Sequence, residues 1–220
     1  MKRAIKRGAV CRSAILNSAI KLFHAQGFQA TNLRDVAAHA GVFLGSIHYH
    51  FGSKQRILYE IVQEVMNKSV AVLDRQVAKG GTPIEVATNI LTAHLEFVLQ
   101  NRIPVSVFLH EYRSLEARYR RMMTRQESRI FGRFVEVLRR GQEQGLIIEG
   151  DARLIGQGAV GVINWSYRWY KEECGISIEE VKSTLVGFIM RAISKRKTDT
   201  SHLSRHILPS RRYASRVAVK

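Results

Sequence analysis

Apolar residues recur every three or four positions through almost the whole chain, and this spacing limits the fold more than any other feature. Between residues 13 and 27 the apolar positions are Ile15, Leu16, Ala19, Ile20, Leu22 and Phe23. This spacing is typical of a helix that buries one face. Strand signals are nearly absent, because the one short β-like run, at residues 146–148, is too isolated to build a sheet. The sequence therefore predicts an all-α fold.

Capping residues and breaks divide the chain into successive helices. The expected helices cover residues 13–27, 32–40, 44–50, 54–79, 83–101, 104–115, 117–144, 152–171 and 178–194. N-caps are expected at Thr31, Ser53, Thr82, Asp151 and Ser177. Glu85 and Glu180 complete two capping boxes, in which side chains and backbone N–H groups at a helix start satisfy one another. Helix ends are expected at Gly27, Gly41 and Gly145, and Pro104 is expected to start a new helix.

Positive charge is concentrated at the two ends of the chain. The 220 residues include 35 Lys and Arg against 18 Asp and Glu, which gives a formal net charge of +17. Residues 1–12 hold five basic side chains and no acidic one, and residues 195–220 hold eight against one. Such an excess predicts a polyanionic partner, with the ends acting as basic arms. The apolar content of 45% indicates a globular body between them.

Neither a membrane span nor a disulfide framework is expected. The apolar runs are far shorter than the roughly 20 residues that a bilayer requires, and no apolar h-region follows the basic N-terminus. The two cysteines, Cys11 and Cys174, are too few and too far apart for a stapled fold. These observations predict a protein of the reducing cytoplasm.

The segment GVFLGSIHYHFGSK, residues 41–54, follows a short helix and contains another. Three short helices with Gly41 at the bend predict a helix-turn-helix unit, whose last helix enters the major groove of DNA. Gly45 and Ser46 are small, so this helix can approach base edges closely. Ile47 and Phe51, four residues apart, are expected to face the core.

Polar groups on the same helix suit contact with DNA. His48, Tyr49 and His50 can donate hydrogen bonds to phosphate oxygens, and the Tyr49 ring can also contact a thymine methyl group or a sugar. Lys54 is expected in the first turn of the following helix, where its charge and the free backbone N–H groups both attract phosphate.

The segment AILNSAIKLFHAQGFQATNLRDVAAHAGVFLGSIHYHFGSKQRIL resembles the DNA-binding domain of the TetR family of transcriptional repressors. The matching motifs are A…LF…G, T…L.DVA..AGV, GS…Y.HF.SK and IL, and they stay in register along the segment. The resemblance implies a homodimer that binds a palindromic operator and a variable C-terminal domain that binds an inducer. Carried over by position, it implies DNA contacts at Thr31, Asn32, Arg34, Ser46, His48, Tyr49, His50 and Lys54.

The resemblance also implies a division of the chain. We expect a DNA-binding domain over residues 9–69, with the helix-turn-helix motif at about 32–51. A ligand-binding and dimerisation domain follows over residues 70–195, and a disordered basic tail over 196–220.

Two positions depart from the family pattern. Phe43 stands where Ser or Thr is usual, so the third helix is expected to lack its side-chain cap, and His48 stands where many members have Tyr.

Rival interpretations of these residues fit the chain less well. His48 and His50 lie about 200° apart around a helix, so they cannot share a metal ion. The segment GQGAVG, Gly156 to Gly161, has the spacing of a dinucleotide-binding loop but follows no strand. We expect instead that Gly158 and Gly161 give a helix a thin face for close packing. We therefore expect no catalytic residue, metal or cofactor, and an enzyme or nucleotide-binding protein that uses this segment is the alternative.

The C-terminal helices carry the expected inducer site. Its candidate residues are Leu95, Val98, Leu99, Val107, Phe108, Glu111, Tyr112, Met122, Arg125, Arg129, Trp165 and Trp169. Glu111 is either a salt-bridged core residue or a polar anchor, and most of the apolar positions also serve as core. Arg121, Arg125, Arg129 and Arg133 form a row that is either a solvated face or a phosphate-binding ridge for an acyl-CoA.

The last helices suggest both the ligand class and the dimer contact. The segment NWSYRWYKEECGISIEEV is similar to TetR-type repressors of fatty-acid or sterol breakdown that respond to CoA thioesters. A fatty acid or a drug-like apolar inducer is the alternative. The apolar positions of residues 152–171 and 178–194 exceed what one helix pair can bury, which predicts a two-fold interface with the same helices of a partner. Ligand entry is expected to swing the helix that begins at Lys54 and release the operator.

Overall fold

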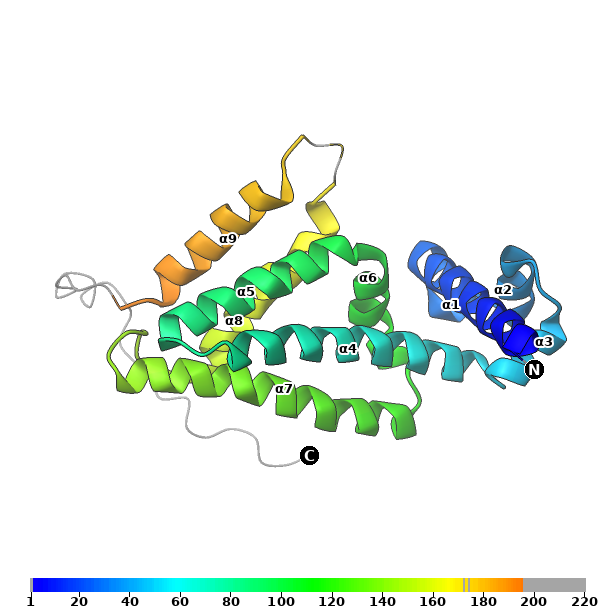
Figure 1. The fold of residues 1–220 in the computed structure, drawn as a ribbon, viewed down its shortest axis with the longest axis horizontal. Helices are drawn as coiled ribbons and strands as arrows, with labels where there is room; N and C mark the ends of the chain where they lie inside the picture. The colour runs from blue at the N-terminus through cyan, green and yellow to red at the C-terminus, as the bar shows by residue number, and fades with distance from the viewer. Residues whose placement is uncertain (1, 172, 174, 196–220) are drawn as a thin grey trace, which may run out of the picture.

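The computed structural model describes residues 2–171, 173 and 175–195, and the predicted basic tail at 196–220 lies outside these residues. The described part is all-α, as the sequence predicts (Figure 1). Its helices are α1 (Lys2–Ala30), α2 (Leu33–Ala40), α3 (Leu44–His50), α4 (Lys54–Ala78), α5 (Pro83–Gln100), α6 (Arg102–Glu111), α7 (Ala117–Glu143), α8 (Ala152–Trp169) and α9 (Ile178–Ile193), with a 3₁₀ turn, η1 (Tyr112–Ser114), between α6 and α7.

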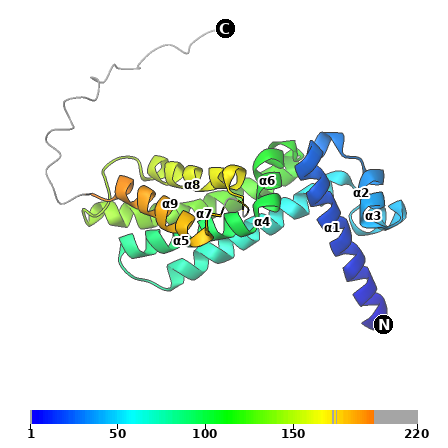
Figure 2. The same cartoon turned by 90° about the horizontal axis from the view of Figure 1, so that it is seen from above.

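The helices form two parts joined along α4. Helices α1 to α3 lie at one end of the molecule, and α5, α7, α8 and α9 form the body at the other end (Figure 1). Helix α4 runs from the first part into the body, and the boundary expected at residues 69 and 70 falls inside it. The N-terminal half of α1 extends away from the body (Figure 2). A continuous helix, and no loop, therefore connects the two parts.

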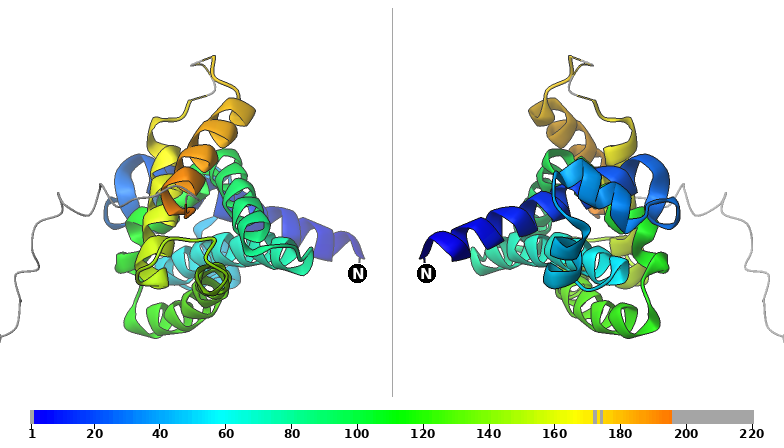
Figure 3. Two further views of the ribbon diagram at one scale, coloured as in Figure 1. Left: turned by 90° about the vertical axis from the view of Figure 1, so that its left-hand side faces the viewer. Right: turned by 90° about the vertical axis from the view of Figure 1, so that its right-hand side faces the viewer.

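Two hydrophobic clusters support these parts. The N-terminal cluster contains the fully buried Ile15, Ile47, Ile57 and Leu58, and the body cluster is built largely from α5, α7, α8 and α9. Val107 from α6 and Met123 from α7, each 1% exposed, complete the N-terminal cluster rather than the body cluster. The right-hand view of Figure 3 shows α1 to α3 in front of the helices of the body. The helix-turn-helix unit is thus packed against α6 and α7 of the body.

The capping signals account for most helix boundaries. Ser53, Thr82, Asp151 and Ser177 are N-caps as predicted, and both capping boxes are confirmed. Gly41 closes α2 in the left-handed conformation, with φ of 65°, which a residue without a side chain adopts at little cost.

The N-cap predicted at Thr31 is wrong, because Asn32 caps α2. Asn32 Oδ1 accepts from the Asp35 N–H at 2.9 Å, and the Asp35 carboxylate accepts from the Asn32 N–H. Thr31 is buried, and its hydroxyl instead donates to the Gly27 carbonyl oxygen at 2.8 Å. The hydroxyl is therefore used to close the end of α1 rather than to open α2.

Two other boundaries differ from expectation. Helix α1 begins at Lys2 instead of residue 13, so the basic N-terminal stretch continues the helix, although Gly27 interrupts it with φ of 83°. Helix α6 begins at Arg102, before Pro104, and ends at Glu111. Proline is tolerated in the first turn because the N–H groups there have no helical partner, so it did not force a new start.

The loop after α7 pairs with the end of α9. Ile147 and Ser194 form an isolated antiparallel bridge, in which the Ile148 N–H donates to Ile193 O and the Lys195 N–H donates to Leu146 O, both at 2.9 Å. This is the β-like run noticed in the sequence, and it anchors the end of α9 to the body. Among the described residues, no helix is both long and apolar enough to cross a membrane.

The close-packing glycine of α8 is Gly156, not Gly158 or Gly161 as expected. A Cβ atom at Gly156 would lie 3.2 Å from both Leu138 and Phe131 of α7. Gly158 and Gly161 are exposed, and a Cβ atom on either would meet nothing within 4 Å. The segment lies inside a helix, so the GxGxxG spacing carries no nucleotide loop.

Gly156→Leu is expected to lower the free energy of unfolding by about 1–3 kcal/mol, because its side chain must displace Leu138 and Phe131. Urea unfolding followed by circular dichroism at fixed protein concentration measures the change. The control is Gly132→Ala on α7, where an added Cβ meets nothing within 4 Å and better helix propensity should stabilise by up to about 1 kcal/mol. Equal stability of Gly156→Leu and the wild type would contradict the packing described.

Candidate functional site

Helix α3 presents a polar and aromatic face to solvent. Ile47 and Phe51 are 0% and 6% exposed, which confirms that they face the core. On the opposite face Tyr49 is 85% exposed, and Gly45 and His48 are also exposed. Ser46 and His50 are half-buried, and the His50 ring packs edge-on against Tyr49. The predicted contacts of α3 therefore share one accessible surface around Tyr49.

The start of α3 lacks a side-chain cap, as predicted from Phe43. Phe43 makes no capping hydrogen bond, and its ring is 88% exposed. The Ser46 N–H of this first turn donates instead to the Phe43 carbonyl oxygen at 2.9 Å. The exposed Phe43 ring thus lies at the start of α3, on the same helix as the exposed Tyr49.

The predicted contacts outside α3 are placed less uniformly. Arg34 is exposed on α2 and free to reach a phosphate, whereas the Asn32 side chain is occupied in capping α2. The Thr31 side chain is 1% exposed, so its hydroxyl cannot reach DNA in this conformation. The sequence motif fixed the place of Thr31 but not the direction of its side chain.

The half-buried side chain of Lys54 is bonded to backbone carbonyl groups of the chain itself. Its ammonium nitrogen donates to Phe28 O at 2.8 Å, to Thr31 O at 2.7 Å and to Gln29 O at 3.3 Å. It also lies 4.4 Å from the centre of the Phe28 ring. Burial lowers the pKa of Lys54, and the nearby Glu111 carboxylate opposes that change. These contacts satisfy the free carbonyl groups at the end of α1, a structural role that the sequence did not indicate.

Glu111, at the end of α6, also binds the backbone at the end of α1. Its carboxylate accepts from the Phe28 N–H at 3.1 Å and from the Ser114 hydroxyl at 2.9 Å. Gln55, next to Lys54, donates to Ser114 O at 2.8 Å and accepts from the Glu116 N–H at 3.0 Å. Together these bonds form what we call the clasp, which joins the end of α1 to α4, α6 and the start of α7. The sequence left Glu111 open between core and ligand roles, and the structure places it, half-buried, in the clasp.

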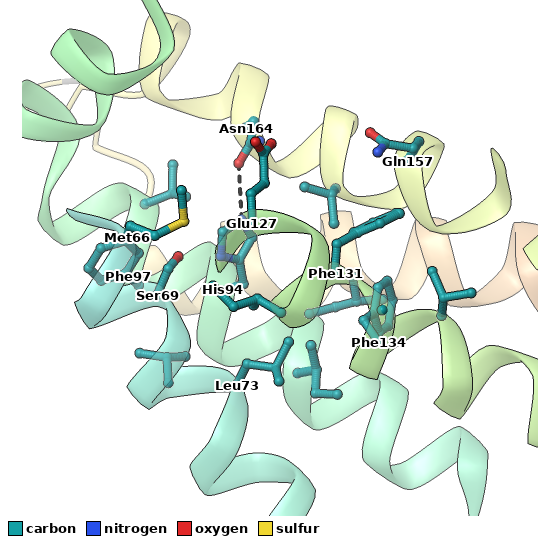
Figure 4. Close-up of a pocket in the computed structure, with 18 of the residues that line it drawn as sticks. Met66, Ser69, Leu73, His94, Phe97, Glu127, Phe131, Phe134, Gln157 and Asn164 are labelled. Atoms are coloured by element: carbon teal, nitrogen blue, oxygen red, sulfur yellow. Dashed lines mark hydrogen bonds between the residues drawn. The ribbon is translucent and has the colours of Figure 1, made fainter. Parts of the chain in front are cut away.

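The body contains a cavity of about 580 Å³, which we call the main cavity. Its walls come from α4, α5, α6, α7 and α8 and include Met66, Phe97, Phe131 and Phe134 (Figure 4). A volume of this size lies within the range of small-molecule sites. Aromatic and methionine side chains can adapt to apolar ligands of different shape.

A small polar group sits within these apolar walls. His94 Nε2 donates to Asn164 Oδ1 at 3.0 Å, as the dashed line in Figure 4 marks. Burial lowers the pKa of His94, although the bond to Asn164 opposes this change, so the imidazole is neutral at pH 7. Burial likewise raises the pKa of Glu127, against a smaller opposing effect of its hydrogen bond to Tyr112. Glu127 is an exposed residue, so the less exposed polar part of the cavity is the neutral pair of His94 and Asn164.

Positive charge lines another part of the main cavity. Arg139 of α7 and Arg153 of α8 both contribute to its wall, next to Gln157, and both are exposed to solvent. Arg139 lies 3.9 Å from Glu136, a loose contact that leaves most of its donors available. The cavity thus combines a neutral, mostly apolar interior with cationic groups that reach solvent.

The predicted ligand residues scatter relative to this cavity. Val98 and Phe108 line it, whereas Leu95 and Leu99 are buried core residues behind its wall. Val107 and Glu111 lie on the side of α6 that faces α1, away from the main cavity. Tyr112 packs against the N-terminal hydrophobic cluster. Met122, Arg125 and Arg129 are exposed on α7, and Trp165 and Trp169 are exposed on α8. Helix periodicity could not tell which apolar face borders a cavity and which borders a neighbouring helix.

The sequence did not identify most of the residues that line the main cavity. They include apolar residues such as Met66 and Phe131 and the polar residues His94, Asn164 and Glu127. A weak signal existed, because His94 lies in α5 between buried apolar positions, where a polar side chain requires a partner. That partner, Asn164, is 70 residues away on α8.

Comparisons with known proteins agree with this architecture. A family model described as bacterial regulatory proteins, tetR family, matches residues 15–61, and one described as tetracyclin repressor-like, C-terminal domain, matches residues 80–193. The HTH-type transcriptional repressor KstR2 of Mycolicibacterium smegmatis is 24% identical over 192 residues, which cover 86% of this chain and 93% of the relative.

Solved structures share the fold. The ketosteroid transcriptional regulator KstR2 of Mycobacterium tuberculosis is similar with a TM-score of 0.78 and 23% identity, covering 84% of this chain and 95% of that one. AibR, solved in complex with isovaleryl coenzyme A and operator DNA, is similar with a TM-score of 0.74 and 21% identity, covering 81% and 97%.

The architecture and the exposed face of α3 define a helix-turn-helix DNA-binding regulator. The chain belongs to the TetR family of transcriptional regulators. The recognition made from the N-terminal motifs is confirmed, and the enzyme alternative built on Gly156–Gly161 is not supported.

Lys54→Met is expected to lower the free energy of unfolding by about 1.5–3 kcal/mol, because the carbonyl groups of the clasp lose a charged donor. The slope of log affinity against log salt, measured with a generic duplex by fluorescence anisotropy, should stay unchanged. The matched charge-removing control is Arg34→Gln, which should reduce that slope by roughly 0.9 and leave stability within about 0.5 kcal/mol. Unchanged stability with a reduced slope for Lys54→Met would instead make Lys54 a phosphate contact.

Proposed function

We propose that this chain is a homodimeric repressor whose affinity for its operator falls when an amphipathic ligand of the acyl-CoA class occupies the main cavity. The ligand class is inferred from one observation: the main cavity combines a neutral apolar interior with Arg139 and Arg153 in its wall. An acyl group suits the interior. The phosphates of coenzyme A suit guanidinium groups that remain in contact with solvent.

The relatives support this ligand class. AibR is described in complex with isovaleryl coenzyme A, and KstR2 is described as a ketosteroid regulator. The neutral His94 and its partner Asn164 offer hydrogen bonds to a carbonyl or hydroxyl group on the acyl part. A bare fatty acid is the second candidate, but burying its carboxylate among the apolar walls of the cavity would be costly.

The proposed DNA contacts follow the accessible surface of the N-terminal part. Arg34, Ser46, His48, Tyr49 and His50, with the backbone at Gly45, form a surface on α2 and α3 that can enter a major groove. Asn32, Thr31 and Lys54 support this surface from behind through capping, closure of α1 and the clasp.

The proposed dimer contact lies on α8 and α9. Leu154, Trp165, Trp169 and Phe188 are 71%, 58%, 43% and 57% exposed, and the exposed Gly158 and Gly161 lie on α8 between the first two. Exposed aromatic groups next to glycines offer knobs and hollows that a second copy could fill. A two-fold axis here would set the two α3 helices about 34–36 Å apart, one turn of DNA.

Ligand control is proposed to pass through α4 and α6. Both helices line the main cavity, and both hold the end of α1 through the clasp. A ligand that separates α4 from α6 would alter the grip of Lys54 and Glu111 on the segment before α2. A coupling of only about 1–3 kcal/mol changes affinity by 5–150-fold, so a small displacement is sufficient.

Acyl-CoA thioesters are expected to release the protein from its own promoter DNA, and Arg139→Gln/Arg153→Gln should weaken that effect at least about tenfold in ligand concentration. Anisotropy of labelled promoter fragments, titrated with thioesters of increasing acyl size, measures the release. The control is Arg125→Gln/Arg129→Gln, which removes the same charge from the exposed face of α7 outside the cavity wall. Equal weakening by both pairs would contradict the assigned phosphate site, and release by free fatty acids alone would select the second candidate.

Phe188→Glu is expected to convert the dimer to a monomer at micromolar concentration, because a carboxylate would be buried against its own copy. Sedimentation velocity measures the change in mass. Ile103→Glu, at an apolar residue that is 41% exposed on α6, is the matched control and should remain dimeric. A monomeric wild type would contradict the proposed interface outright.

A further inference from the structure

A second cavity of about 410 Å³ lies between α1, α6 and the end of α8, at the junction of the two parts. Its wall shares no residue with that of the main cavity, because Val105, Phe108 and Leu109 of α6 face the main cavity while Ser106, Val107 and His110 face this one. We propose that this junction cavity is a second effector site, which binds a small phosphate-type anion.

The charges that line the junction cavity favour an anion. Arg102, Arg168 and Lys171 are basic, and His24 and His110 add imidazole rings, whereas Glu111 is the one carboxylate among the described lining residues. Both Glu111 oxygens already accept hydrogen bonds, from the Phe28 N–H and the Ser114 hydroxyl. No described carboxylate forms an ion pair with Arg102, Arg168 or Lys171 within 4.0 Å. Cations gathered around a hollow concentrate positive potential and attract anions.

Two of these cations are positioned by aromatic rings. The Arg102 guanidinium lies 5.8 Å from the centre of the Tyr170 ring, and that of Arg168 lies 5.3 Å from the Trp165 ring. Stacking restricts the planes of these groups and leaves their N–H donors free, as bidentate binding of phosphate requires. His24 Nδ1 and Ser106 Oγ, 2.6 Å apart, and the bonded pair of His110 and Tyr167 add polar groups to the wall.

The position of the cavity connects it to DNA binding. Gly27 and Glu111, which belong to or adjoin the clasp, are part of its wall. An anion held here would lie beside the carboxylate that fixes the Phe28 N–H, and would therefore change the electrostatic environment of the clasp. The bound group could be a free phosphate-bearing metabolite or the phosphate end of a larger thioester, since both present the same chemistry.

Isothermal titration of the full-length protein with inorganic pyrophosphate, without DNA and at about 150 mM salt to screen weak surface binding, tests the site. The wild type should bind, and Arg168→Gln/Lys171→Gln should weaken binding at least about tenfold. The control pair Arg121→Gln/Arg140→Gln removes equal charge from exposed positions on α7 and should change the affinity less than about twofold. Sedimentation velocity confirms that the variants keep the same oligomeric state.

Absence of binding at about 10 mM pyrophosphate, or equal weakening by both pairs of substitutions, would overturn the proposal, since the second result describes only general attraction to a basic protein. Free coenzyme A is titrated in parallel. Tighter binding of coenzyme A than of pyrophosphate, lost in Arg168→Gln/Lys171→Gln, identifies the thioester end as the source, and the reverse order identifies a free anion. The measurement does not involve operator release, so its failure leaves the role of the main cavity untouched.

Discussion

The clasp at the end of α1 is the contact on which the arrangement of the two parts depends. The chain breaks its first helix at Gly27, and the carbonyl groups exposed there need donors. Lys54 supplies them from α4, while Glu111 accepts the Phe28 N–H from α6. Both side chains are half-buried, and several hydrogen bonds satisfy their charged groups there. The orientation of the helix-turn-helix unit is therefore set by polar bonds to α4 and α6, which also line the main cavity.

Much of the fold was accessible from local signals. Four of the predicted N-caps, both capping boxes and the bounds of α3 were correct, because these depend on side chains within a few residues of the backbone they serve. The N-cap predicted at Thr31 was wrong, because tertiary packing rather than a local signal decides where this hydroxyl binds. The hydroxyl donates to the Gly27 carbonyl oxygen at the end of α1 and does not cap α2. Rules for helix capping do not include the packing of α1 against α2, which places the hydroxyl there.

The sites were less accessible than the fold. The inward and outward faces of α3 followed from the spacing of Ile47 and Phe51, so that surface could be predicted. The main cavity could not, because its polar pair joins His94 and Asn164 across 70 residues, and only the tertiary structure brings them together. Arginine periodicity on α7 pointed to a row at 121–133, but the cavity wall uses Arg139 on the same helix and Arg153 on the next one.

Phe108 contributes to both hydrophobic clusters, while the residue before it belongs to the N-terminal cluster alone. A change of ligand preference made at this ring would therefore also disturb the packing beneath the helix-turn-helix unit. A substitution at such a position would change both the set of ligands that bind and the occupancy of the promoter in the absence of ligand. In a lineage of related regulators, or in a biosensor evolved in the laboratory, new specificity gained at α6 would be accompanied by compensating substitutions on the far side of the same helix.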